Sequence, residues 1–152
     1  MANSQAMCTS FKGELLSATH NFSSANPAHT ANTADTFKAA LYLTTASLGA
    51  ATTAYSATGE VSGTGYSAGG VTVNNATNPT TGGTTGYWTP SASITYTSVT
   101  LSTAFDAVLI YNSSQSNKAV SVHTFGSQTV TAGTFALTMP TNAAGTALIN
   151  IA

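Results

Sequence analysis

Short stretches of β-branched and aromatic residues alternate along the chain with stretches rich in Gly, Asn, Ser and Pro. This pattern is typical of strands bounded by turns, and helical periodicity is nearly absent. One face of a strand carries Phe105, Ala107, Leu109 and Tyr111, which is the alternation expected of a half-buried strand. The predicted strands lie at residues 10–16, 37–44, 71–74, 92–101, 105–112, 119–125, 134–139 and 147–151.

The segment 35–43 allows two interpretations. Asp35 could cap a short helix, because Asp is a favoured residue at helix N-termini. Phe37, Ala39 and Leu41 also fall on one face of a strand, and Leu43 continues the pattern. We favour the strand.

Seven or eight short strands in 152 residues predict an all-β fold, a single-domain β-sandwich or jelly roll with long loops. The length fits one domain. Turn-rich loops are expected at residues 21–36, 54–70, 75–86 and 112–117, and loop 75–86 contains Pro79 and a Gly pair. Residues 1–10 are expected to form an extended arm that becomes ordered only against a neighbouring molecule.

Charge is scarce in this chain. Only 5% of residues are charged, against roughly 25% in an ordinary soluble domain, and the net charge is -1. The cations are Lys12, Lys38 and Lys118, and there is no arginine. Near-zero net charge favours association, so a neutral Ser, Thr, Asn and Ala surface suits burial against other protein copies. Disorder is disfavoured, because 42% of residues are hydrophobic.

The same composition excludes several classes of partner. Nucleic-acid binding and a polybasic membrane anchor both need clustered Lys or Arg. The longest apolar runs are far shorter than the roughly 20 residues that span a bilayer. A lone Cys8 provides neither a disulfide framework nor a zinc site, and no secretory signal precedes it. We therefore expect no cofactor, and synthesis and assembly in a cytoplasm.

One motif suggests a hydrolase. Residues Gly65-Tyr66-Ser67-Ala68-Gly69 match the G-x-S-x-G nucleophile elbow, and Asp106 and His123 follow in the order of an α/β-hydrolase triad. The elbow requires a strand that turns sharply into a helix, whereas the residues after Gly70 read as a strand. The sequence therefore predicts that the protein is not an enzyme.

Two other chemistries are disfavoured by spacing. The three histidines, His20, His29 and His123, lack the spacing of a metal site. The carboxylates Glu14, Glu60 and Asp106 invite comparison with the acid pair of glycoside hydrolases. The alternative, which we favour, is that each carboxylate accepts turn N–H groups or pairs with a lysine.

Aromatic residues mark the candidate contact surface. Tyr87-Trp88 beside the loop 75–86, with Tyr66 nearby, could form a platform for a sugar or another subunit. A slightly favoured alternative is that Trp88 closes one end of the core. The strand at residues 147–151 is expected to be an edge strand that seeks a partner copy, in a dimer or a trimer. The candidate interface residues are Phe22, Tyr66, Tyr87, Trp88, Ile149 and Ile151.

Two groups of short sequence words resemble small virion proteins of tailed bacteriophages. The first group is Thr53-Ala-Tyr55, Gly59-Glu60-Val61, Gly63-Thr-Gly65-Tyr66 and Gly69-Gly70. The second is Ala104-Phe105-Asp-Ala107-Val108-Leu-Ile110-Tyr111, Phe125-Gly126 and Thr134-Phe135 before an apolar C-terminal strand. Such proteins include capsid decoration or cement proteins, head fibres and tail components.

The resemblance implies a non-enzymatic structural protein of the virion, and we favour a capsid cement protein. Such a subunit sits across junctions between copies of the major capsid protein and holds the shell against DNA pressure. Many modest interfaces repeated over a lattice then give avidity. The alternative is a tail or fibre component that recognises a host surface glycan through the aromatic loop.

Overall fold

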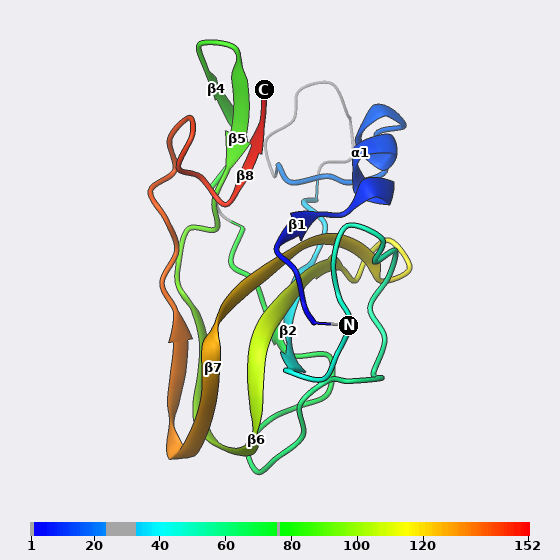
Figure 1. The fold of residues 1–152 in the computed structure, drawn as a ribbon. Helices are drawn as coiled ribbons and strands as arrows, with labels where there is room; N and C mark the ends of the chain where they lie inside the picture. The colour runs from blue at the N-terminus through cyan, green and yellow to red at the C-terminus, as the bar shows by residue number, and fades with distance from the viewer. Residues whose placement is uncertain (1, 24–32, 76) are drawn as a thin grey trace.

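The computed structural model describes residues 2–23, 33–75 and 77–152 (Figure 1), so His29 lies outside the described residues. These residues form two antiparallel sheets and one short helix, an all-β fold as predicted. The elements are β1 (Ala6–Met7), α1 (Thr9–Leu16), β2 (Phe37–Leu43), β3 (Val71–Thr72), β4 (Thr80–Gly82), β5 (Thr85–Trp88), β6 (Ile94–Asn112), β7 (Lys118–Leu137) and β8 (Ile149–Ile151).

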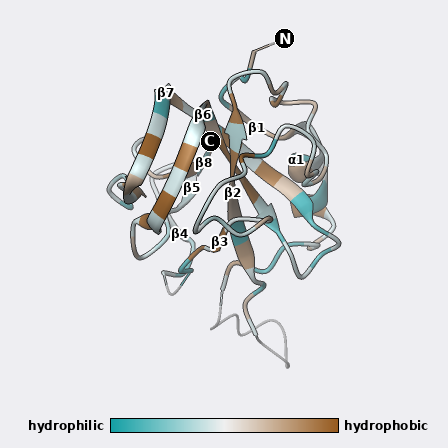
Figure 2. Ribbon diagram, turned by 90° about the horizontal axis from the view of Figure 1, so that it is seen from below, coloured by the Kyte–Doolittle hydropathy of each residue, from teal (hydrophilic) through white to brown (hydrophobic). Residues whose placement is uncertain are grey.

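The larger sheet has the strand order β1-β7-β6-β2-β3, and its centre is the long hairpin β6–β7. Each of these two strands joins two predicted strands into one. β6 contains the predicted strands 92–101 and 105–112, except for its first two positions, and β7 contains 119–125 and most of 134–139. Hydrophobic and polar residues alternate along both strands in Figure 2.

The β6–β7 hairpin folds back on itself. Phe125 and Phe135 are ten residues apart in β7, yet their ring centroids are 5.4 Å apart, whereas a straight strand of that length spans about 33 Å. Register shifts interrupt the ladder at the bend, where Ser98 and Ala132 have φ values of 54° and 46°. In Figure 1 β7 runs to the lower end of the molecule and returns beside its own first half. The two halves of β7 therefore bring Phe125 and Phe135 into contact.

Strand β2 is buried on both faces. Phe37, Leu41 and Tyr42 have no exposed surface, and the prediction of a strand rather than a helix here is confirmed. Tyr96, in the first half of β6, donates a hydrogen bond to the Ala39 carbonyl oxygen, 2.8 Å away. Tyr66 accepts one from the Leu41 N–H group at 3.0 Å. The segment 54–70 and the folded hairpin together exclude water from β2.

The predicted strand at residues 10–16 is wrong, because these residues form helix α1. Phe11 and Leu15 share one face at both the helical and the strand period, so the pattern does not separate the two. Lys12, Glu14 and Leu16 are good helix formers, and the segment has no β-branched residue after Thr9. In the described part of the chain no helix has the length and hydrophobicity to cross a membrane.

The expectation of an arm that orders only against a neighbour is also wrong for residues 2–8. β1 pairs with β7, with Ala6 opposite Val122. The Asn3 side chain donates to the Leu43 carbonyl oxygen at 2.9 Å and accepts from the Leu48 N–H at 3.0 Å. These bonds satisfy polar groups of the arm within its own chain.

The smaller sheet has the order β4-β5-β8 and lies at one end of the molecule (Figure 1). The predicted exposed loop at residues 75–86 contains most of its β4–β5 hairpin, with Gly83 at the turn in the left-handed region at φ 59°. The predicted strand at 147–151 is shortened to β8, which pairs with β5. This hairpin and α1 form the two sides of the candidate site.

Candidate functional site

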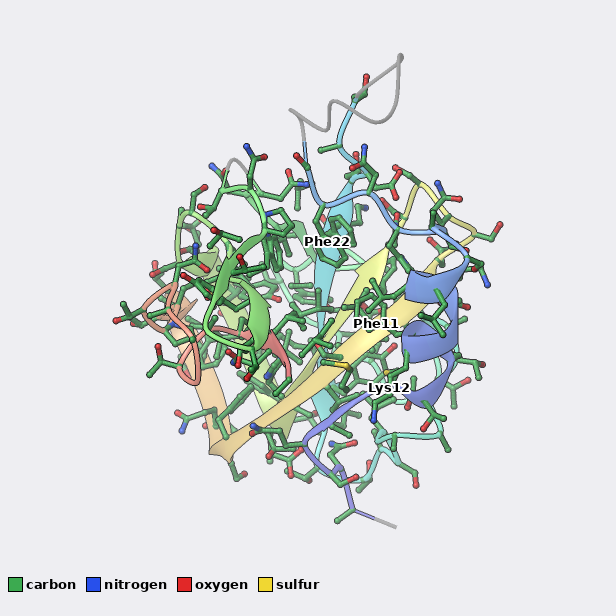
Figure 3. All side chains as sticks on the ribbon, turned by 90° about the horizontal axis from the view of Figure 1, so that it is seen from above. Phe11, Lys12 and Phe22 are labelled. Carbon is green, nitrogen blue, oxygen red and sulfur yellow. The ribbon has the colours of Figure 1, made fainter. Side chains whose placement is uncertain are left out.

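An apolar groove of about 580 Å³ lies between α1 and the smaller sheet. Phe11 and Leu15 line it from α1, Tyr87 and Trp88 from β5, and Ile149 and Ile151 from β8. Phe22 lies between the two sides, and Figure 3 shows Phe11 and Phe22 side by side in the space between the helix and the small sheet. The groove is therefore built from segments far apart in the sequence.

Packed aromatic rings form the base of the groove. Phe22 stacks on Phe37 at a centroid distance of 4.3 Å and meets Trp88 edge-on at 4.8 Å. The Trp88 indole N–H donates to the Thr77 carbonyl oxygen at 2.8 Å, and the residue is only 2% exposed. Trp88 thus belongs to the core while one edge of it lines the groove. This burial agrees with the interpretation that Trp88 closes one end of the core.

The structure brings together five of the six candidate interface residues. Phe22, Tyr87, Trp88, Ile149 and Ile151 all line the groove. Ile151 is 45% exposed at its rim, so part of the apolar surface faces solvent. Tyr66 does not line the groove. Sequence reasoning missed Phe11 and Leu15, whose i, i+4 spacing is the available signal once the segment is recognised as a helix.

A chain of polar contacts fixes the helix side of the groove. Lys118 Nζ lies 2.6 Å from Glu14 Oε1, and His20 Nε2 lies 2.8 Å from Glu14 Oε2. The amide nitrogen of Asn112 lies 3.0 Å from His20 Nδ1 and 2.7 Å from a carboxylate oxygen of Asp35. These contacts tie α1 to β7, to β6 and to the segment before β2.

The contacts also assign the protons. A carboxylate only accepts hydrogen bonds, so the atom of the Asn112 amide that faces Asp35 is its nitrogen. The same NH₂ group faces His20, and His20 Nδ1 therefore accepts from it. His20 is then a neutral imidazole that donates from Nε2 to Glu14. Burial raises the pKa of Glu14, but the hydrogen bonds from Lys118 and His20, together with the charge of Lys118, outweigh it and lower the pKa overall. Both His20 nitrogens are engaged, so neither is free to transfer a proton to a bound molecule.

A second carboxylate, Glu60, holds a cluster of tyrosines on the other side of β2. It accepts hydrogen bonds from Tyr55 and Tyr66 at 2.7 Å each and from the Gly69 N–H at 2.8 Å. Burial, followed by the contact with Glu60, raises the pKa of Tyr55 to about 12. Tyr66 thus anchors the segment 54–70 on the sheet. Glu60 and Glu14 match the interpretation that carboxylates accept turn N–H groups or pair with lysine.

The hydrolase motif is not assembled into a triad. Ser67 lies in a turn, where its carbonyl oxygen accepts a hydrogen bond from the Gly70 N–H. Strand β3 follows this turn, rather than a helix. Asp106 accepts a hydrogen bond from Asn3 at 2.6 Å, and His123 Nε2 lies 2.9 Å from Ser121 Oγ. Within the described ranges, no group of three or more His, Cys, Asp or Glu residues could hold a metal ion.

His123 gives a prediction for acid stability. Burial lowers the pKa of this partly buried histidine from 6.5 to about 4. The unfolded chain therefore binds more protons than the folded one between pH 6.5 and pH 4, so the free energy of unfolding should fall across this window as pH falls. We expect a loss of about 2 kcal/mol, measured by urea unfolding at about pH 7.5 and about pH 4.5.

The variant His123→Gln is the control for this prediction, because glutamine keeps a hydrogen-bonding side chain without a titrating ring. Its stability should change much less between the two pH values. Equal pH dependence in both proteins would contradict the assignment to His123.

In comparisons with protein-family models, curated proteins and solved structures, no match to this chain was found.

Proposed function

We propose that this chain is a non-enzymatic structural protein of a tailed-bacteriophage virion, specifically a capsid cement or decoration subunit. It binds the major capsid protein or another virion protein through the groove between α1 and the smaller sheet. The observation that carries the proposal is this groove, an apolar surface lined by Phe22, Tyr87 and Ile151, on a molecule with only 5% charged residues.

The chemistry of the groove supports protein binding over catalysis. Aromatic side chains such as Trp and Tyr, clustered near the centre of a well-packed apolar surface, are enriched in protein-binding hot spots. Of the two titratable residues that line the groove, His20 and Tyr87, the histidine is engaged by Glu14 and Asn112. The groove offers apolar contact area and a few fixed polar atoms, which suits insertion of apolar side chains from a partner.

We also propose a β-sandwich architecture for the whole chain. The folded-back β6–β7 hairpin supports it, since its two halves enclose Phe105, Phe125 and Phe135 between two layers. A sandwich places loops and short hairpins at its ends. The groove would then be one end surface, which leaves the rest of the molecule available for contacts with neighbours in a lattice.

A charge placed at the rim tests the role of the groove. The variant Ile151→Asp places a carboxylate where a 45% exposed side chain stands. The unbound protein should therefore still fold, whereas a carboxylate buried in the interface should weaken binding. We expect incorporation into virions to fall by about tenfold or more, which corresponds to about 1.4 kcal/mol. The measurement is the copy number per purified particle by quantitative mass spectrometry.

The matched control is Thr58→Asp, which adds the same charge to an exposed residue outside the groove. Its copy number should equal that of the wild type. The wild-type number is itself decisive, because a lattice role requires on the order of hundreds of copies per particle. A few copies per particle would overturn the cement proposal, as would unchanged incorporation of Ile151→Asp.

A second candidate function is a tail or fibre component that binds a host surface glycan. It is favoured by the polar part of the groove lining, where Asn21 and Asn78 line the same groove as Tyr87. Amide groups beside an aromatic ring suit a sugar, whose hydroxyl groups form hydrogen bonds and whose apolar face stacks on the ring. Low copy number together with binding to intact host cells, lost in Tyr87→Ala, would support this function instead.

A further inference from the structure

We infer that β7 pairs edge to edge with β7 of a second copy of the chain, so that one sheet continues across two molecules. This inference rests on the part of the proposed function that has copies of the chain assembling together, and it names the surface that joins them. The groove is a different surface and plays no part in it.

The first observation is an open strand edge. On the side away from β6, β7 is paired with β1 at Ser121 and Val122 only, and residues 53–55 cover its first positions. From residue 124 to its end at Leu137, no other strand of the described chain is paired with this edge. Figure 1 shows the returning half of β7 on the outside of the molecule. Unpaired N–H and C=O groups along such an edge are a template for another strand.

The second observation is that this edge lacks the residues that usually prevent pairing. Residues 124–137 include no charged residue and no proline, although Lys and Pro are the common means of protecting an edge. Thr134 and Ala136, on the returning half, are exposed and small. Two copies related by a two-fold axis bring the same strand against itself, so an uncharged edge meets no like charge. This self-complementarity selects a second copy as the partner.

The third observation is an apolar cleft beneath the open edge. A cavity of about 140 Å³ lies there, lined by Phe125 from the first half of β7, Leu137 from the returning half, and Met139 just after it. These three side chains pack against the core but are only partly buried. A neighbouring copy would cover the open side of the two layers. Backbone pairing and apolar burial would then act at the same place.

The bulges at the bend limit where pairing occurs. Near Ala132, β7 carries an extra residue and a positive φ. The backbone N–H and C=O groups on its open edge are therefore not in register for pairing with another strand there. After the bend the register is regular, with Thr95 opposite Ala136 and Ile94 opposite Leu137. We therefore place the intermolecular ladder on residues 134–137, with the cleft beside it.

Charged edge variants test the inference on purified full-length protein by sedimentation equilibrium. The wild type should dimerise. The double variant Thr134→Lys with Ala136→Lys brings cations face to face, and its dimer dissociation constant should rise by about a hundredfold or more. The matching variant with Glu at both positions should behave likewise. An equimolar mixture of the two variants should recover dimers, because opposite charges then face each other.

The control places two lysines on exposed residues of another segment, Thr58→Lys with Ser62→Lys, and should dimerise like the wild type. If the edge variants do not fold, Ala136→Cys gives an independent test. Cys8 is fully buried and burial raises the pKa of its thiol to about 11, so the new thiol is the reactive one. Mild oxidation should then yield a covalent dimer, whereas Thr58→Cys should not.

Three results would overturn the inference: a wild type that stays monomeric at millimolar concentration, edge variants that associate as tightly as the wild type, or a Lys–Glu mixture that stays monomeric. Each is independent of the virion copy number, which tests the proposed function. A dimer without incorporation into virions would therefore refute the virion role and keep the β7 interface.

Discussion

Replacing Gly70 by alanine should reduce the free energy of unfolding by more than about 4 kcal/mol, enough to prevent folding of a marginally stable domain. Gly70 has φ 71°, which disfavours any side chain, and an added Cβ would overlap the carbonyl oxygen of Ala39 in β2. That contact is with backbone, so no rotamer change relieves it. The expected result is loss of soluble folded protein or a large shift of the urea midpoint.

Gly83→Ala is the matched control for this prediction. Gly83 has a similar φ of 59° at the β4–β5 turn, but no atom lies within 4 Å of the added Cβ. Only the backbone strain remains, which costs about 1 kcal/mol. If both variants lost the same stability, the close approach of Gly70 to β2 would not be the cause. The difference between them isolates the contact that holds residues 54–70 on the sheet.

After Gly70→Ala, the largest expected effect is that of Glu60→Leu, which should reduce the free energy of unfolding by about 3 to 4 kcal/mol. Leucine is similar in size but accepts no hydrogen bond, so the hydroxyls of Tyr55 and Tyr66 and the Gly69 N–H would lose their acceptor. Glu60→Gln keeps one acceptor oxygen and should lose only about 1 to 2 kcal/mol. Urea unfolding at neutral pH measures both.

A spectroscopic measurement separates this role from simple packing. Because burial and Glu60 together raise the pKa of Tyr55 to about 12, removal of the carboxylate in Glu60→Gln should lower that pKa in an ultraviolet pH titration. Asp106→Asn is the control, since Asp106 accepts one side-chain bond, from Asn3. The free energy of unfolding of Asp106→Asn should fall by about 1 kcal/mol or less. If Glu60→Gln and Asp106→Asn lowered the free energy of unfolding equally, the special role of Glu60 would be contradicted.

The sequence predicted the strands well where alternation is local, and less well where the chain bends. The two predicted gaps, at residues 102–104 and 126–133, fall at the bend of the continuous strands β6 and β7. Small and polar residues there interrupt the alternation, and the sequence does not distinguish a strand that ends from one that bulges and continues. The folded-back hairpin could not be predicted from periodicity alone.

The groove was predictable in part for a similar reason. Aromatic residues beside the predicted loop 75–86 indicated Tyr87 and Trp88, and the predicted edge strand indicated Ile149 and Ile151. Tyr66 looked equivalent to them, but its hydroxyl is bound by Glu60, a partner that no spacing rule identifies. The opposite wall was missed because α1 was predicted to be a strand.

The contacts between the helix side of the groove and β7 impose an order on the folding of each newly synthesised chain. Glu14 and its partner Lys118 are 104 positions apart, and at ribosomal speed the later residue follows the earlier by roughly 5 to 20 s. During that delay the ion pair between α1 and β7 cannot form, and the early segment relies on its contacts with residues 43–50, such as the bonds of Asn3 to Leu43 and Leu48. Nascent chains interrupted before residue 118 lack the whole of β7, so proteolysis should remove them before assembly begins.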